Sequence, residues 1–182
     1  MFRSHTYGKV NIEQIPEKLL DFYNKVKEYD TPIQIIVGTD SQNHSMYNEF
    51  NTETHSMSKK HVANTKMVSV IAILCERHGG IYFYEISRVD KISDVRQKLY
   101  TETESSLNIA DKLLEIIESD KKYEEMYLNT TFTIHVDAGH SNKGKTADLI
   151  PSLVGWITSQ GFEYSVKPDS FVASTIADRI SK

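Results

Sequence analysis

Two aspartates each follow a run of apolar and β-branched residues, and their positions suggest chemistry. Residues 33–37 lead to Asp40, and residues 132–136 lead to Asp137. Such runs predict strands buried in a sheet, and open α/β sheets place their sites at the carboxyl ends of strands. If the two strands are neighbours, the carboxylates converge, and their repulsion must be offset by a divalent cation or a shared proton. The pair therefore predicts a metal site.

The surrounding sequence predicts the elements that must position these acids. Apolar residues at helical spacing indicate an N-terminal helix over about residues 12–29, whereas residues 41–63 are polar, lack periodicity and predict an exposed loop. Gly79 and Gly80 favour a hairpin turn between two β-rich runs. Strands are predicted at 33–39, 64–75, 80–88, 131–137 and 162–167, and further helices at 92–119, 145–159 and 169–181.

The order of these elements predicts one α/β domain over residues 1–182. The first three strands follow one another directly and indicate an antiparallel meander, whereas the later strands alternate with helices and should pair in parallel. We therefore expect a mixed five-stranded sheet flanked by helices.

Composition narrows the class of protein. A chain of 182 residues suits one domain, which buries roughly 70% of the surface that its unfolded form exposes. The net charge of −4 weighs modestly against a general nucleic-acid binder, although an acidic metal site would itself add negative charge. The first residues lack an apolar signal segment, and no run reaches the roughly 18 apolar residues of a membrane span. We expect a cytoplasmic protein without membrane association, and the sequence sets no oligomeric state.

The element order resembles the ribonuclease H-like fold, with Asp40 on the first strand and Asp137 on the fourth. This resemblance implies a glutamate on the helix after the meander and a further acid on the last helix. Glu104 is the first choice for the glutamate because it stands beside the apolar stripe of its helix, and Glu102 is the alternative. Asp178 is the candidate on the last helix, because its Ala-Asp-Arg-Ile-Ser context resembles the stretch that carries the last acid in ribonucleases H.

Several short motifs also resemble the YkuK family, a group of small bacterial proteins described as ribonuclease H-like. These motifs occur in order as GTDSQ at 38–42, VDAGH at 136–140, VKPD at 166–169 and ADR at 177–179. The resemblance covers roughly residues 33–182 apart from the polar loop. It implies a fold and a metal site and does not specify a substrate.

Four acids in this order predict a metal-dependent nuclease acting on RNA, DNA or a hybrid. Carboxylates suit Mg²⁺ or Mn²⁺, and two such ions activate water and stabilise the leaving oxygen of a phosphodiester. Asp40 would bridge both ions, and Glu104 (or Glu102), Asp137 and Asp178 would each hold one. Further candidates for contacts to the ligands or to substrate phosphates are Ser41, Gln42, His140, Lys143 and Lys145.

Two other functions remain open. The net negative charge and the missing strong basic face favour a non-catalytic ribonuclease H-like module that binds or regulates. The segment from Gly139 to Thr146, GHSNKGKT, matches the phosphate-loop pattern G-x-x-x-x-G-K-[ST] after a strand and before a helix. Nucleotide binding is disfavoured there because phosphate-loop domains normally begin with this loop and build forward, whereas only one strand follows it here.

Overall fold

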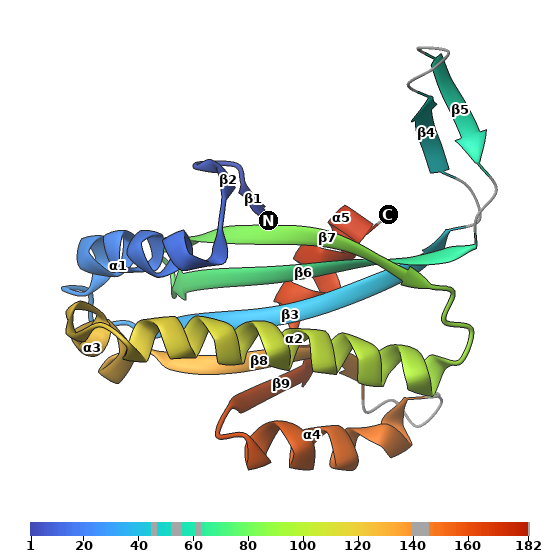
Figure 1. Cartoon of the computed structure of the whole chain (residues 1–182). Coiled ribbons are helices and arrows are strands. Elements are labelled where there is room, and N and C mark those ends of the chain that lie inside the picture. The colour runs from blue at the N-terminus through green and yellow to red at the C-terminus, as the bar shows by residue number, and fades with distance from the viewer. Residues whose placement is uncertain (45–46, 52–55, 61–62, 140–145, 182) are drawn as a thin grey trace.

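A seven-stranded mixed sheet forms the centre of the computed structural model, with strand order β2-β1-β7-β6-β3-β8-β9 (Figure 1). The structure describes residues 1–44, 47–51, 56–60, 63–139 and 146–181. The strands of the main sheet are β1 (Phe2–Ser4), β2 (Gly8–Val10), β3 (Ile33–His44), β6 (Asn64–Cys75), β7 (Gly79–Asp90), β8 (Thr131–Gly139) and β9 (Glu163–Lys167). A separate two-stranded sheet consists of β4 (Tyr47–Asn51) and β5 (Ser56–Lys60).

The α/β class and the mixed pairing are confirmed, but the expected number of strands was wrong. Strands β3, β6 and β7 form the antiparallel meander, β8 pairs in parallel with β3, and β9 pairs in parallel with β8. The two additional strands, β1 and β2, extend the sheet beyond β7. Each has three residues, which is too short for the alternation that indicates a strand in sequence.

The prediction of a loop over residues 41–63 was also wrong. Strand β3 continues through its polar end to His44, because β6 pairs with it along its whole length, up to His44 opposite Asn64. Beyond that point β4 and β5 form a hairpin that projects away from the main sheet (Figure 1). Backbone pairing stabilises these polar strands, so their sequence shows no apolar periodicity.

Helices cover the two faces of the sheet unequally. The helical segments are η1 (Ile12–Gln14), α1 (Ile15–Val26), α2 (Val95–Glu118), η2 (Lys121–Tyr123), α3 (Glu124–Leu128), η3 (Ala147–Leu149), α4 (Ile150–Ser159), the π-helix η4 (Val172–Ala177) and α5 (Asp178–Ser181). The main core joins α1, α2 and α4 to one face, whereas a smaller core joins η4 to the other. No helix among the described residues is long and apolar enough to cross a membrane.

The alternation of β3 assigns its side chains to these two faces. Ile35 and Val37 belong to the main core, and Ile36 belongs to the smaller core under η4. Odd-numbered residues of β3 therefore face α2, and even-numbered residues face η4 and α5. Gly38 permits the close approach of η4, because a Cβ atom at this position would lie 3.1 Å from both the backbone nitrogen and the Cβ of Ala173.

Candidate acidic site between β3, β8, α2 and α5

Asp40 lies inside β3, four residues before its end, and faces α5. Its side chain is buried, with 6% of the residue exposed, and its Oδ2 accepts a 2.6 Å hydrogen bond from Ser181 Oγ. Burial raises the pKa of Asp40, while the Ser181 hydrogen bond and the charge of Lys98 oppose this shift. The negative charges of Asp137 and Asp178 raise the pKa of Asp40 further, so both acids are close enough to repel it.

Asp137 lies beside Asp40 where two neighbouring strands separate. The parallel pairing of β3 with β8 runs as far as Gly38 opposite His135, and each acid follows two residues later. The pairing of β8 with β9 is irregular between Val136 and Gly139, as in a β-bulge. Bulges interrupt a ladder and redirect side chains, so this irregularity separates the carboxylate from the regular sheet.

A lysine from the edge strand partly neutralises Asp137. Lys167 Nζ lies 2.8 Å from Asp137 Oδ1, and the Asp137 side chain is 20% exposed. This oxygen is itself buried and has no hydrogen bond of good geometry. Asp137 therefore keeps an ion pair but retains hydrogen-bonding capacity for a further partner.

Glu102, rather than Glu104, lies on the side of α2 that packs against the sheet, and the charges of both aspartates act on it. Glu102 is buried on α2, and its Oε1 accepts a 2.7 Å hydrogen bond from Ser41 Oγ and lies 3.7 Å from Lys98 Nζ. Burial raises the pKa of Glu102 to about 7 against the hydrogen bond from Ser41 and the charge of Lys98, and the charges of the two aspartates raise it further.

Glu104 is exposed and lines a different hollow together with Glu85 and Ser87. Two residues turn about 200° around a helix, so only one of Glu102 and Glu104 can face the sheet. The structure thus places the predicted alternative at the site and the first choice away from it. Sequence spacing alone could not separate them, because the buried side of α2 is itself partly polar.

Buried hydroxyl groups hold α2 in the position that directs Glu102 inward. Ser106 Oγ lies 2.9 Å from Thr39 Oγ1 and 3.0 Å from the carbonyl oxygen of Glu102, and Thr39 Oγ1 lies 2.9 Å from Ser69 Oγ. Hydroxyl groups can donate and accept at once, so this chain connects β6, β3 and α2. The polar contacts fix the helix against the sheet beside the acids.

Asp178 completes the group from the other face of the sheet. It is the first residue of α5 and is half-buried, and its Oδ1 accepts a 3.4 Å hydrogen bond from Gln42 Nε2. Ser181, one turn later, donates to Asp40. The predicted contact residues Ser41 and Gln42 therefore lie against Glu102 and Asp178. Sequence reasoning missed Lys98, Lys167 and Ser181. The last two lie within the VKPD motif and the Ala-Asp-Arg-Ile-Ser stretch, but these patterns do not show which acid a lysine or serine contacts.

The donor chemistry of this group fits a hard divalent cation. All four acids offer oxygen ligands, which Mg²⁺ and Mn²⁺ prefer. A cation would offset the burial and the added charge repulsion that raise the pKa of Asp40 and Glu102. As they stand, no three Asp, Glu, His or Cys side chains of the described residues are gathered closely enough to hold an ion. Metal binding would therefore require the carboxylates to turn from Ser181, Lys98 and Lys167 toward one another.

Some predicted residues lie outside this geometry. His140, Lys143 and Lys145 fall outside the described residues, and so does most of the phosphate-loop segment from Gly139 to Thr146. Their predicted contacts to phosphate, and the nucleotide-binding alternative, stay predictions.

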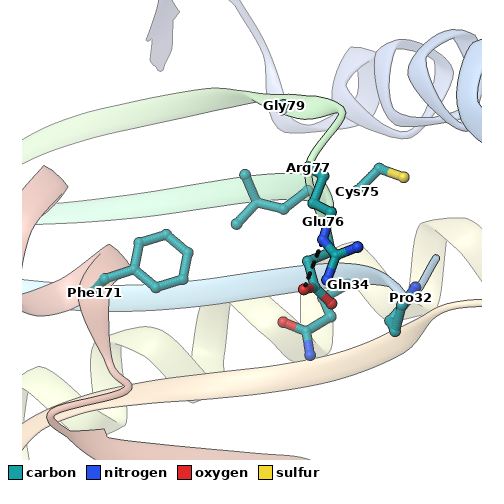
Figure 2. Close-up of a pocket in the computed structure, with 9 residues that line it drawn as sticks. Pro32, Gln34, Cys75, Glu76, Arg77, Gly79 and Phe171 are labelled. Carbon is teal, nitrogen blue, oxygen red and sulfur yellow. Dashed lines mark ion pairs between the residues drawn. The ribbon is translucent and has the colours of Figure 1, made fainter.

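One cavity lies away from the acidic site. It measures about 560 Å³ and lies near the start of β3 and the turn between β6 and β7, lined by Gln34, Arg77 and Phe171 among others (Figure 2). Gln34 precedes Asp40 by six residues, which places the two about 20 Å apart along the strand. Asp40, Glu102, Asp137 and Asp178 do not line this cavity.

Comparisons with known proteins identify the family of the chain. A family model described as "Ribonuclease H-like" matches residues 54–182. A Bacillus subtilis (strain 168) protein named "Uncharacterized protein YkuK" is 28% identical over 188 aligned residues, which cover 100% of this chain and 97% of that protein. No solved structure matches the chain significantly. The chain belongs to the YkuK family and has a ribonuclease H-like fold.

Proposed function

We propose that this protein is a divalent-metal-dependent nuclease that cleaves phosphodiesters of RNA, DNA or a hybrid. The observation that carries the proposal is that Asp40 and Glu102 are buried where β3 and β8 separate, and that burial and then the charges of neighbouring acids raise the pKa of both. Proteins rarely bury acids that repel one another without a functional reason, because each charged carboxylate loses its hydration on burial. Perturbed carboxylates of this kind cluster at functional sites.

Each acid has a distinct part in this proposal. Asp40 is central and would be shared between ions, whereas Glu102, Asp137 and Asp178 would each contribute one carboxylate. Bound Mg²⁺ or Mn²⁺ would supply an activated water and stabilise the leaving oxygen. Ser41 orients Glu102 and Gln42 orients Asp178 through their hydrogen bonds.

The direct test combines metal binding with cleavage. Calorimetry should show saturable Mn²⁺ binding to the wild-type protein and weaker binding to Asp40→Asn. A panel of single-stranded RNA, single-stranded DNA and hybrid duplex should be cleaved with Mn²⁺, and Asp40→Asn should lower the rate by about 100-fold or more, since loss of a group that stabilises the transition state has this size. Asp111→Asn, the same change at an exposed position of α2, is the matched control. Equal cleavage by Asp40→Asn and the wild type would contradict the proposal.

A non-catalytic binding or regulatory module is the second candidate, and one observation favours it. The carboxylates already have protein partners, with Ser181 donating to Asp40 and Lys167 paired with Asp137. A module that never binds metal would need such partners permanently. Absence of saturable Mn²⁺ binding, together with absence of cleavage in the panel, would support this candidate over the nuclease.

A further inference from the structure

The sheet face that carries Asp40 continues beyond α5 onto β7, β1 and β2. Arg3 on β1 lies opposite Tyr84 on β7 and opposite Lys9 on β2. Residues directly opposite each other in antiparallel strands share a face. The neighbours Phe2 and Val10 are buried in the main core on the other face, which confirms that Arg3 and Lys9 point away from α1 and α2.

Two tyrosines and an arginine of β7 lie on this same face. Tyr82 and Tyr84 are half-buried against the smaller core, Ile86 is 39% exposed and Arg88 is exposed. Lys66 on β6 lies opposite Arg88, and its Nζ donates a hydrogen bond to the carbonyl oxygen of Ile180. We call the surface formed by Lys9, Arg3, Tyr82, Tyr84, Arg88 and Lys66 the basic strip.

The charge of the basic strip differs from that of the whole chain. The chain has a net charge of −4, yet this face of β2, β1, β7 and β6 carries four cations. On these four strands Asp90, at the end of β7, is the acid that the same alternation places with them. A concentration of cations on an acidic protein is complementary to a polyanion.

The tyrosines indicate which polyanion fits this face, namely a single-stranded nucleic acid. Flat sheet surfaces with aromatic side chains stack single-stranded bases, and cations beside them follow the phosphates. A duplex keeps its bases stacked on one another and presents mainly phosphates, so Tyr82 and Tyr84 would gain little from it.

The basic strip leads directly to the acidic site. Lys66 lies opposite Gln42, and Val68 on β6 lies opposite Asp40. Four strand spacings separate β2 from β3, a distance of about 19 Å. This span suits about five stacked nucleotides at ~3.4 Å each.

We propose that a single-stranded nucleic acid binds across the basic strip, with its phosphates on Arg3, Lys9 and Arg88 and its bases against Tyr82 and Tyr84. From there the nucleic-acid strand passes Lys66 and reaches Asp40. The choice of nucleic acid as ligand rests on the proposed function, but binding on this face needs neither metal nor cleavage.

Fluorescence anisotropy with a labelled ten-nucleotide oligo-dT, in EDTA and low salt, tests the proposal. The double variant Arg3→Glu/Lys9→Glu should weaken binding at least about tenfold. Lys25→Glu/Lys112→Glu makes the same charge change at exposed positions of α1 and α2, and should retain affinity within about twofold. Thermal denaturation of each variant checks that it remains folded. Equal losses in both double variants, or no loss in the first, would overturn the proposal.

Variants of Tyr84 distinguish base stacking from general electrostatic attraction. Tyr84→Ala should weaken oligo-dT binding at least about fivefold, whereas Tyr84→Phe should bind like the wild type, because stacking needs the ring and not the hydroxyl group. A duplex of the same length that binds as tightly as the single strand would contradict the assignment to unpaired bases.

Asp40→Asn distinguishes failure of this inference from failure of the nuclease proposal. The variant should bind oligo-dT at least as tightly as the wild type, because a negative charge is removed, and should lose cleavage. Retained cleavage would overturn the nuclease and leave the basic strip intact, whereas wild-type binding by Arg3→Glu/Lys9→Glu would overturn the basic strip alone.

Discussion

Glu102 connects the acidic site to the pH dependence of folding. Its pKa of about 7 in the folded protein exceeds the ordinary value of 4.5, because burial disfavours the charged form. Between pH 4.5 and pH 7 the folded state binds more protons than the unfolded state. The free energy of unfolding therefore falls as the pH rises through this range. Burial raises the pKa of Asp40 too, which acts in the same direction.

We expect Glu102→Gln to remove much of this loss. The shift corresponds to about 3 kcal/mol at most, since one pKa unit is about 1.36 kcal/mol. The metal-free wild type should therefore lose free energy of unfolding from pH 5 to pH 8 relative to Glu102→Gln. Urea denaturation at several pH values measures this difference, and Glu104→Gln is the matched control on the exposed side of α2. Parallel curves for the wild type and Glu102→Gln would contradict the assignment.

Lys167 competes with any cation for Asp137. Because its ammonium group lies 2.8 Å from Asp137 Oδ1, we expect Lys167→Ala to tighten Mn²⁺ binding by about threefold, the scale of a partly exposed ion pair. Lys25→Ala, at an exposed position of α1, should leave the affinity unchanged. Calorimetry provides the measurement, and weaker binding by Lys167→Ala would indicate that the lysine supports the site.

At the scale of elements, the position of η4 depends on Gly38. A methyl group there would lie 3.1 Å from the backbone nitrogen of Ala173, so Gly38→Ala should push η4 from β3 and lower the free energy of unfolding by about 1–3 kcal/mol. Gly155→Ala in α4 meets nothing within 4 Å and should be neutral or stabilising by up to about 1 kcal/mol. Urea denaturation measures the free energy of unfolding of both variants. Equal values would show that η4 can move away from β3 without loss of stability.

The sequence predicted the central elements because their apolar patterns are strong. The runs that became β3, β6 and β8 have continuous apolar stretches, and α2 has a regular apolar stripe. The short strands β1 and β2, the polar end of β3 and the β4–β5 hairpin depend on pairing with other segments, which local patterns do not contain. The same limit explains the site. Asp40 and Asp137 could be identified from their own strands, whereas Glu102 and Ser181 required knowledge of which helix side meets the sheet.

At the scale of the whole molecule, one core joins segments from both ends of the chain. Phe2 and Phe162 belong to the same buried cluster, and Trp156, the single tryptophan, packs against Tyr100 of α2 with ring centroids 6.2 Å apart. We therefore expect the domain to unfold as one cooperative unit. Tryptophan fluorescence and far-ultraviolet circular dichroism should give coincident urea transitions. A separate early transition in either would show that part of the sheet unfolds independently.

The hydrogen bond from Ser181 to Asp40 joins residues that are 141 positions apart. Ribosomes make the chain from its N-terminus and domains fold as the chain emerges, so Asp40 is synthesised long before the residue that holds it. Asp137 and Asp178 are also synthesised well after Asp40. A nascent chain therefore carries an incomplete acidic site until its last helix has been translated. If the protein is the nuclease proposed above, such delayed assembly would keep a growing polypeptide inactive beside the messenger RNA that encodes it.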